Sequence, residues 1–170
     1  MAEGYGRGLV VWALALASAL VITLLAACSG DPGSGPLDPK WDRFACERCR
    51  MVLSDRNHSA QVRIPQADGR SRVLFFDDIG CAVIWLDDKP SRDDPRTEIW
   101  VTDWRTGDWI DARQAYYLAG QLTPMEYGLG AQADTAPGAM RFTAAREHIF
   151  EVERKYNVHG GHLDAAPRDW

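Results

Sequence analysis

The sequence predicts an α+β domain made of two small strand–strand–helix units that lie side by side. The first observation is a pair of short strands, at 59–64 and 73–76, which flank a turn containing Asp-Gly. The second is a short apolar helix at 79–86, directly after these strands. The third is a charged, amphipathic helix near the C-terminus, which follows a second group of strands. Strands and helices mixed in this way are typical of the α+β class.

The N-terminal 27 residues are expected to be a signal peptide rather than part of this domain. Residues 9–27 are almost continuously apolar and end in Leu-Ala-Ala before Cys28. This arrangement resembles the lipobox of bacterial lipoproteins, in which the cysteine is acylated, for example with palmitate, and becomes the new N-terminus. The alternative is an uncleaved anchor, because about 19 apolar residues are just enough to span a bilayer. Both interpretations place the remaining chain on the outer side of a membrane, and we expect a periplasmic protein.

Residues 28–40 are predicted to be a lipidated, flexible linker, since they are rich in Gly, Pro and Ser and have no apolar period. The domain itself is expected at 41–170, with the boundary between its two units near residue 104. The 170-residue chain has 19 basic and 24 acidic side chains, and a net charge of −5. These charges are interspersed and form no basic cluster, which argues against nucleic acid as a partner.

The order of strands and helix in the first unit is predicted from alternating apolar residues and from turn residues. Ala60, Val62 and Ile64 share one face of the first strand, and the turn at 65–70 leads to the second strand. Asp77 or Asp78 is suited to cap the helix that follows. A strand at 98–102 completes the unit, giving the order strand, strand, helix, strand.

The second unit begins after a turn at 103–108. Trp109-Ile110 are predicted to pair across this turn with the strand at 98–102. The second unit is expected to run through 109–118, with a loop at 120–128 and a short strand at 129–133. Asp134 or Thr135 is then expected to cap the last helix, with Pro137 in its first turn. Its apolar stripe consists of Met140, Phe142, Ala145, Ile149, Phe150 and Val152, and Gly160-Gly161 is expected to end it.

A cluster of sulfur-containing side chains precedes both units. Cys46, Cys49 and Met51 place two thiols and a thioether within six residues, in a chain with four cysteines and four methionines. Soft donors of this kind suit Cu(I), and thiolates alone also suit Zn(II). On spacing alone, a disulfide or redox pair of the two cysteines, with the methionine packed inside, is an equally good interpretation. Three cysteines remain once Cys28 is lipidated, and an odd number argues against a framework made only of disulfides.

Other candidate ligands are weaker. Met125 lies in a Thr-Pro-Met loop, and His58 is the histidine closest to the sulfur motif in the sequence. Cys81 lies inside the apolar helix, where a small buried side chain is the commoner role. His159 and His162 flank two glycines, where imidazoles usually stay at the surface. No arrangement of nucleophile and base is recognisable, so we expect a protein that is not an enzyme.

Four features, taken in order, resemble the NosL family of lipoprotein accessory factors of nitrous oxide reductase. They are Leu-Ala-Ala-Cys28, the Cys46-x-x-Cys49-x-Met51 motif, the Phe-Asp-Asp-Ile-Gly-Cys run at 76–81 with the Phe before it, and the Thr-Pro-Met125 loop. The resemblance covers residues 44 to 160. It implies a pair of ββαβ units and a Cu(I)-binding chaperone used in denitrification. The implied partners are apo nitrous oxide reductase and its ABC-type membrane assembly complex.

The resemblance makes Met125 an expected copper ligand, together with sulfur from Cys46, Cys49 or Met51. Two positions depart from the family pattern: Arg50 replaces a small residue, and Glu126-Tyr127 follow Met125 in place of smaller ones. A diverged member that serves another cuproprotein would fit these differences.

Two other functions remain open at the level of sequence. One is an extracytoplasmic thiol-disulfide oxidoreductase that uses Cys46 and Cys49. A thioredoxin-like motif, however, lies between a strand and a helix, whereas here a linker precedes the pair and a strand follows it. The other is a structural zinc site made of the same two cysteines with two of His58, Cys81 or a carboxylate.

Overall fold

The computed structural model describes residue 12 and residues 31–156. The predicted signal peptide with its lipidated Cys28, and the C-terminal segment with His159, His162 and the two glycines, lie outside the described residues. By its internal contacts the chain forms two units, Met1–Pro32 and Gly33–Trp170, and the elements below all belong to the second. No helix within the described ranges is both long enough and apolar enough to cross a bilayer.

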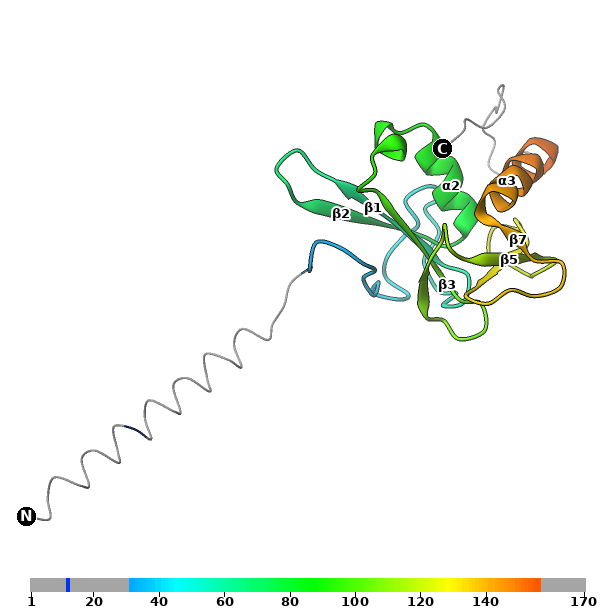
Figure 1. The fold of residues 1–170 in the computed structure, drawn as a ribbon, viewed down its shortest axis with the longest axis horizontal. Helices are drawn as coiled ribbons and strands as arrows, with labels where there is room; N and C mark the ends of the chain where they lie inside the picture. Colours follow the sequence, from blue (N-terminus) through cyan, green and yellow to red (C-terminus); the bar gives the residue numbers. More distant parts are fainter. Residues whose placement is uncertain (1–11, 13–30, 157–170) are drawn as a thin grey trace, which may run out of the picture. The chain divides into compact units, whose positions relative to one another are not determined.

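The first sheet has four antiparallel strands, as Figure 1 shows for most of them. They are β1 (Ala60–Pro65), β2 (Ser71–Phe76), β3 (Glu98–Thr102) and β4 (Trp109–Asp111), in the spatial order β2-β1-β3-β4. Helix α2 (Ile79–Asp87) and a single 3₁₀ turn, η1 (Pro90–Asp93), connect β2 to β3. This unit therefore has the predicted strand, strand, helix, strand order, extended by β4 at its edge.

The second sheet has three antiparallel strands in the order β6-β5-β7. They are β5 (Tyr116–Ala119), β6 (Leu129–Gln132) and β7 (Met140–Arg141), and helix α3 (Phe142–Tyr156) follows. One parallel bridge, between Asp103 and Ala131, joins this sheet to the first. The predicted α+β class is confirmed. In the second unit, however, three strands precede the helix, so its order differs from that of the first.

The start predicted for the last helix is wrong. Asp134, Thr135 and Pro137 have the residue types of a helix start, yet α3 begins at Phe142. A turn closed from Ala139 N–H to Ala136 C=O occupies this segment, and Gly138 in it has φ +79°. After the turn, Met140 pairs with Tyr117 in the sheet. Met140 and Arg141, which the sequence pattern assigned to the helix, therefore belong to a strand instead.

The core lies between the first sheet and the helices. Residues on one face of the strands alternate into it, as expected from the period of two. Ala60 and Phe76 are neighbours on this face, and the ring of Phe76 lies 5.6 Å from that of Trp85 in α2. Helix α3 packs beside α2 (Figure 1). The buried apolar residues of this face are Ala60, Val62, Leu74, Phe76, Ile99 and Val101.

The opposite face of the same sheet is covered by residues 33–38, which we call the strap; it is the blue segment after the grey trace in Figure 1. The backbone of Leu37 exchanges two hydrogen bonds with the Gln61 side chain, at 2.9 and 3.1 Å. The backbone of Gly35 donates to Glu98 and accepts from Arg63, at 2.8 and 3.0 Å. Gln61 and Arg63 are consequently buried although they are polar. The second half of the predicted linker is therefore part of the folded domain.

Candidate metal centre

The sulfur motif forms a closed loop. The backbone N–H of Cys46 donates to Met51 C=O at 2.7 Å, and that of Arg50 donates to Cys46 C=O at 3.1 Å. Ala45 and Val52 form an isolated bridge at the base of the loop. Arg50 has φ +67°, the left-handed conformation that a small residue such as glycine adopts more easily. The four residues from Cys46 to Cys49 thus form the turn that a two-cysteine metal motif needs.

The loop is held against the end of β2. Glu47 N–H donates to Phe75 C=O at 2.9 Å, so the thiols lie beside the residues that follow this strand. Asp77 is one of these, and Cys81 lies in the first turn of α2. An acid before a helix and a cysteine in its first turn, four residues later, present their side chains at the same helix end.

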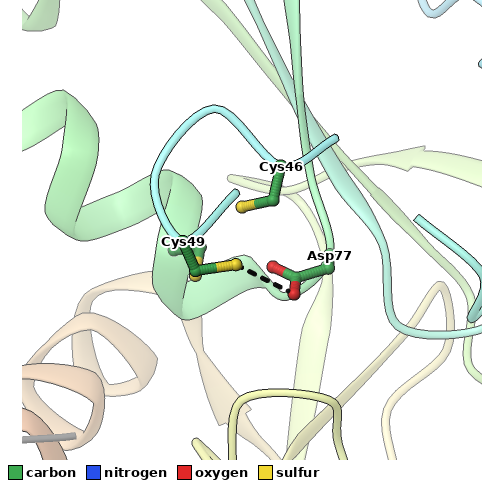
Figure 2. Close-up of side chains that lie close together, drawn as sticks. Cys46, Cys49 and Asp77 are labelled. Atoms are coloured by element: carbon green, nitrogen blue, oxygen red, sulfur yellow. Dashed lines mark hydrogen bonds between the residues drawn. The ribbon is translucent and has the colours of Figure 1, made fainter. Parts of the chain in front are cut away.

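Four side chains from these segments converge on one point. One ligand atom from each of Cys46, Cys49, Asp77 and Cys81 lies within 4.8 Å of all the others. Figure 2 shows the Cys46 side chain above the hydrogen bond in which the Cys49 thiol donates to Asp77 Oδ2, at 3.1 Å. Thiolates bound at about 2.3 Å to one tetrahedral ion lie about 3.8 Å apart, so small side-chain movements suffice for all four to reach a single ion.

Hydrogen bonds between the thiols distribute their protons unevenly. The bond with Cys81 lowers the pKa of the Cys46 thiol to about 7, although burial opposes this change. The bonds to Cys46 and Cys49, together with burial, raise the pKa of Cys81. One thiolate is therefore available near neutral pH, and a metal ion that binds here would displace the protons of the other thiols. The three cysteines are unbridged.

The four side chains differ in their access to solvent. Cys46, Asp77 and Cys81 are buried, whereas Cys49 is half-buried. Cys49 is thus the member of the cluster through which an ion would reach the other three side chains. Met51, with 51% of its surface exposed, lies two residues beyond it. The structure brings the two predicted cysteines together and leaves the Met51 thioether at the surface of the loop.

Met125 is nearly buried in the loop between β5 and β6, and its backbone is tied to the start of α2. Asp78 Oδ2 accepts from the Thr123 hydroxyl at 2.7 Å and from Met125 N–H at 3.3 Å. The other oxygen, Oδ1, caps α2 by accepting from Gly80 N–H at 2.9 Å. Burial raises the pKa of this carboxyl to about 6. One aspartate thus holds the Met125 loop beside Asp77.

A second set of contacts fixes the same loop. The side chain of Arg48, inside the cysteine motif, donates to Tyr127 Oη at 3.0 Å and to Glu153 Oε1 at 2.7 Å. Tyr127 also donates to Glu153, and its ring lies against Gly80 so closely that a Cβ there would be 2.2 Å from it. The cysteine loop, the Met125 loop, α2 and α3 all meet at these side chains.

Replacing Asp78 by alanine is expected to destabilise the domain by about 3–7 kcal/mol. The estimate combines a lost helix cap, worth about 1 kcal/mol, with two buried donors that lose their acceptor. The measurement is the free energy of unfolding in urea, with the exposed Asp88→Ala at the other end of α2 as control. A loss no larger than that of the control would mean that the loop is held in another way.

The sequence between residues 41 and 157 matches the family model NosL. The chain belongs to the NosL family. The solved structure of the copper chaperone NosL from Shewanella denitrificans aligns with a TM-score of 0.45 and 16% identity, over 71% of this chain and 88% of that one. No curated protein matches the sequence.

Two members of the cluster of Cys46, Cys49, Asp77 and Cys81 were not among the copper ligands predicted from the sequence, although Cys81 was a candidate for the structural zinc site. Asp77 was considered only as a helix cap, and Cys81 mainly as a buried apolar residue. Both lie in the Phe-Asp-Asp-Ile-Gly-Cys run, and their spacing around a helix start was the available signal. His58 is not in this cluster, and its Nδ1 lies 2.9 Å from Asp55 Oδ2. That Met51 and Met125 bind the ion stays a prediction.

Proposed function

We propose that this protein is a Cu(I) chaperone, anchored to the outer side of a membrane through Cys28. The observation that carries the proposal is the convergence of three thiol sulfurs at one site in a NosL-family domain. Thiolates are soft ligands and favour Cu(I) over the harder divalent ions that carboxylates prefer. The chaperone binds copper and passes it on, and we do not assign it a catalysed reaction.

The difference in exposure among the ligands supports a transfer role. Cys46 and Cys81 are buried, while Cys49 is half-buried and Met51 exposed. In our proposal, a partner's sulfur displaces Cys49 first, and Met51 keeps the ion coordinated during the exchange. A thioether suits this step because it binds Cu(I) without losing a proton.

We further propose that the copper is delivered for assembly of the copper centres of nitrous oxide reductase, through the ABC-type membrane complex that serves this enzyme. The support is membership of the NosL family together with the lipobox-like sequence before Cys28. The test is to mix Cu(I)-loaded protein with the apo reductase in the presence of the complex, and to measure copper in the separated reductase. Transfer from free Cu(I) at equal rate would contradict a dedicated delivery role.

Binding itself is tested by anaerobic titration of the reduced chain from Ser29 onward with Cu(I), in competition with a chromogenic chelator. We expect one tightly bound ion per chain. Met51→Leu and Met125→Leu are expected to weaken binding, and Met140→Leu, a half-buried methionine in β7, is the matched control. No competition with the chelator would exclude the chaperone. A clean two-electron dithiol titration in its place would favour the oxidoreductase.

The carboxylate of Asp77 supports a second candidate, a structural zinc site. Three thiolates and one carboxylate make a four-ligand set, which is what a closed zinc site uses. Structural zinc usually makes folding depend on the metal. If a chelator leaves the circular dichroism spectrum and the free energy of unfolding unchanged, this function is excluded. Loss of folded structure on chelation, reversed by Zn(II) and not by Cu(I), would establish it.

A further inference from the structure

A second site lies at the opposite end of α2 from the cysteines. It is an open pocket of about 690 Å³ between η1, the segment before β5, and the start of α3. Helix α2 has nine residues and is therefore about 13 Å long. Its last residue, Asp87, contacts Arg146 of the pocket at 3.7 Å, whereas Cys81 lies in its first turn. The pocket is lined by Arg92, Asp93, Asp94, Pro95, Arg113, Arg141, Phe142, Thr143 and Arg146.

The charge of this pocket is opposite to that of the protein. Four arginines and two aspartates line it, a formal charge of +2 in a chain whose net charge is −5. Both aspartates are engaged: Asp93 pairs with Arg92 at 2.9 Å, and Asp94 with Arg96 at 2.7 Å. The carboxylates in the pocket wall therefore do not neutralise the other guanidinium groups.

Two of the four guanidinium groups are held by neutral partners. Arg113 donates to Thr97 C=O at 2.9 Å. Arg141 donates to Gln114 C=O at 2.7 Å, and its guanidinium lies 4.4 Å from the centre of the Tyr116 ring. Within residues 31–156, neither group forms an ion pair with a carboxylate. Their positions are thus fixed, and each keeps N–H donors for a ligand.

Two further features favour an anion. The first residues of α3, Phe142 and Thr143, line the pocket, and the start of a 15-residue helix carries a partial positive charge. Burial lowers the pKa of Arg113, and the nearby Asp111 opposes this effect. A bound anion would stabilise the charged guanidinium of Arg113 and so oppose this effect of burial. Asp111 accepts from the backbone N–H of Arg113 at 2.7 Å and is not part of the pocket lining.

We propose that this pocket binds a small oxyanion with two or more negative charges, either a phosphate or a polycarboxylate. Guanidinium groups bind both through paired N–H donors, and the volume is in the range of small-molecule sites. The site is separate from the metal centre, and the inference does not depend on the copper-binding function.

The test is a titration of the metal-free protein with inorganic phosphate and, separately, with citrate, followed by ¹H–¹⁵N NMR at constant ionic strength set with chloride. We expect saturable shifts, with a Kd of about 1 mM or lower, concentrated at Arg113, Arg141 and Thr143. The tighter of the two anions identifies the class of ligand. Because this map uses the unaltered protein, it does not depend on how well any variant folds.

The variants Arg113→Gln and Arg141→Gln are expected to weaken binding by about tenfold each, since each removes a charged hydrogen bond. Arg70→Gln is the control, because it removes the same charge from the exposed β1–β2 turn. Shifts that do not saturate, shifts spread over the whole surface, or equal weakening by all three variants would each overturn the proposal.

Discussion

Replacement of Cys81 by serine is expected to lower the affinity for Cu(I) by more than ~100-fold. Loss of a group that only orients a ligand already lowers metal affinity by about 10–100-fold, and Cys81 contributes a sulfur to the cluster itself. The hydroxyl of serine is a hard donor and does not replace it. The measurement is competition with a Cu(I) chelator under anaerobic conditions.

The control for this variant is Ala82→Ser, which places the same new side chain one residue further along α2, at another buried position. It is expected to bind Cu(I) normally if it folds, as checked by circular dichroism. An unchanged affinity in a folded Cys81→Ser protein would leave Cys46, Cys49 and the methionines as the ligand set, as expected from the sequence. The structure would then have assigned Cys81 wrongly.

Replacement of Glu153 by alanine is expected to destabilise the domain by about 3–5 kcal/mol, the usual effect of removing one partner from a buried ion pair. The Glu153 side chain is fully buried, and Arg48 is 15% exposed. The substitution leaves Arg48 without this carboxylate and takes an acceptor from the Tyr127 hydroxyl. Since domains are stable by about 5–15 kcal/mol, much of the total stability depends on this residue.

The free energy of unfolding in urea measures the effect, and Glu151→Ala on the exposed side of α3 is the control, expected within about 0.5 kcal/mol of the unaltered protein. The double variant Arg48→Ala/Glu153→Ala is expected to lose less stability than the sum of the losses in the two single variants. The reason is that both substitutions remove the same ion pair. A Glu153→Ala loss below about 1 kcal/mol would show that the pair contributes little.

The sequence predicted the elements of the first unit because their signals are local. The alternation of Ala60 and Val62, the Asp-Gly turn and the cap at Asp78 each act within a few residues. The last helix was placed too early for the same reason. Asp134 and Pro137 have the residue types of a helix start, while pairing of Met140 with Tyr117 depends on a strand more than 20 residues away.

In the candidate site, too, the local features were predicted and the contacts between distant segments were not. The two cysteines of the loop were predicted from their spacing, since a turn of four residues brings them together by itself. Asp77 and Cys81 join them only because the backbone of Glu47 bonds to Phe75 at the end of β2. No periodic pattern encodes this contact. The strap was assigned to a linker because its hydrogen bonds are made to Gln61, Arg63 and Glu98, which lie far along the chain.

The strap also sets how far the domain can stand from its anchor. Its bonds to the sheet begin at Gly33, whose C=O accepts from Ser71 at the start of β2. If Cys28 carries the lipid, only five chain steps separate the lipidated residue from the folded domain, and a fully extended chain of this length reaches about 18 Å. With that anchor, the first residue of the strap would stay within this distance of the bilayer surface, and a partner would have to meet the domain there.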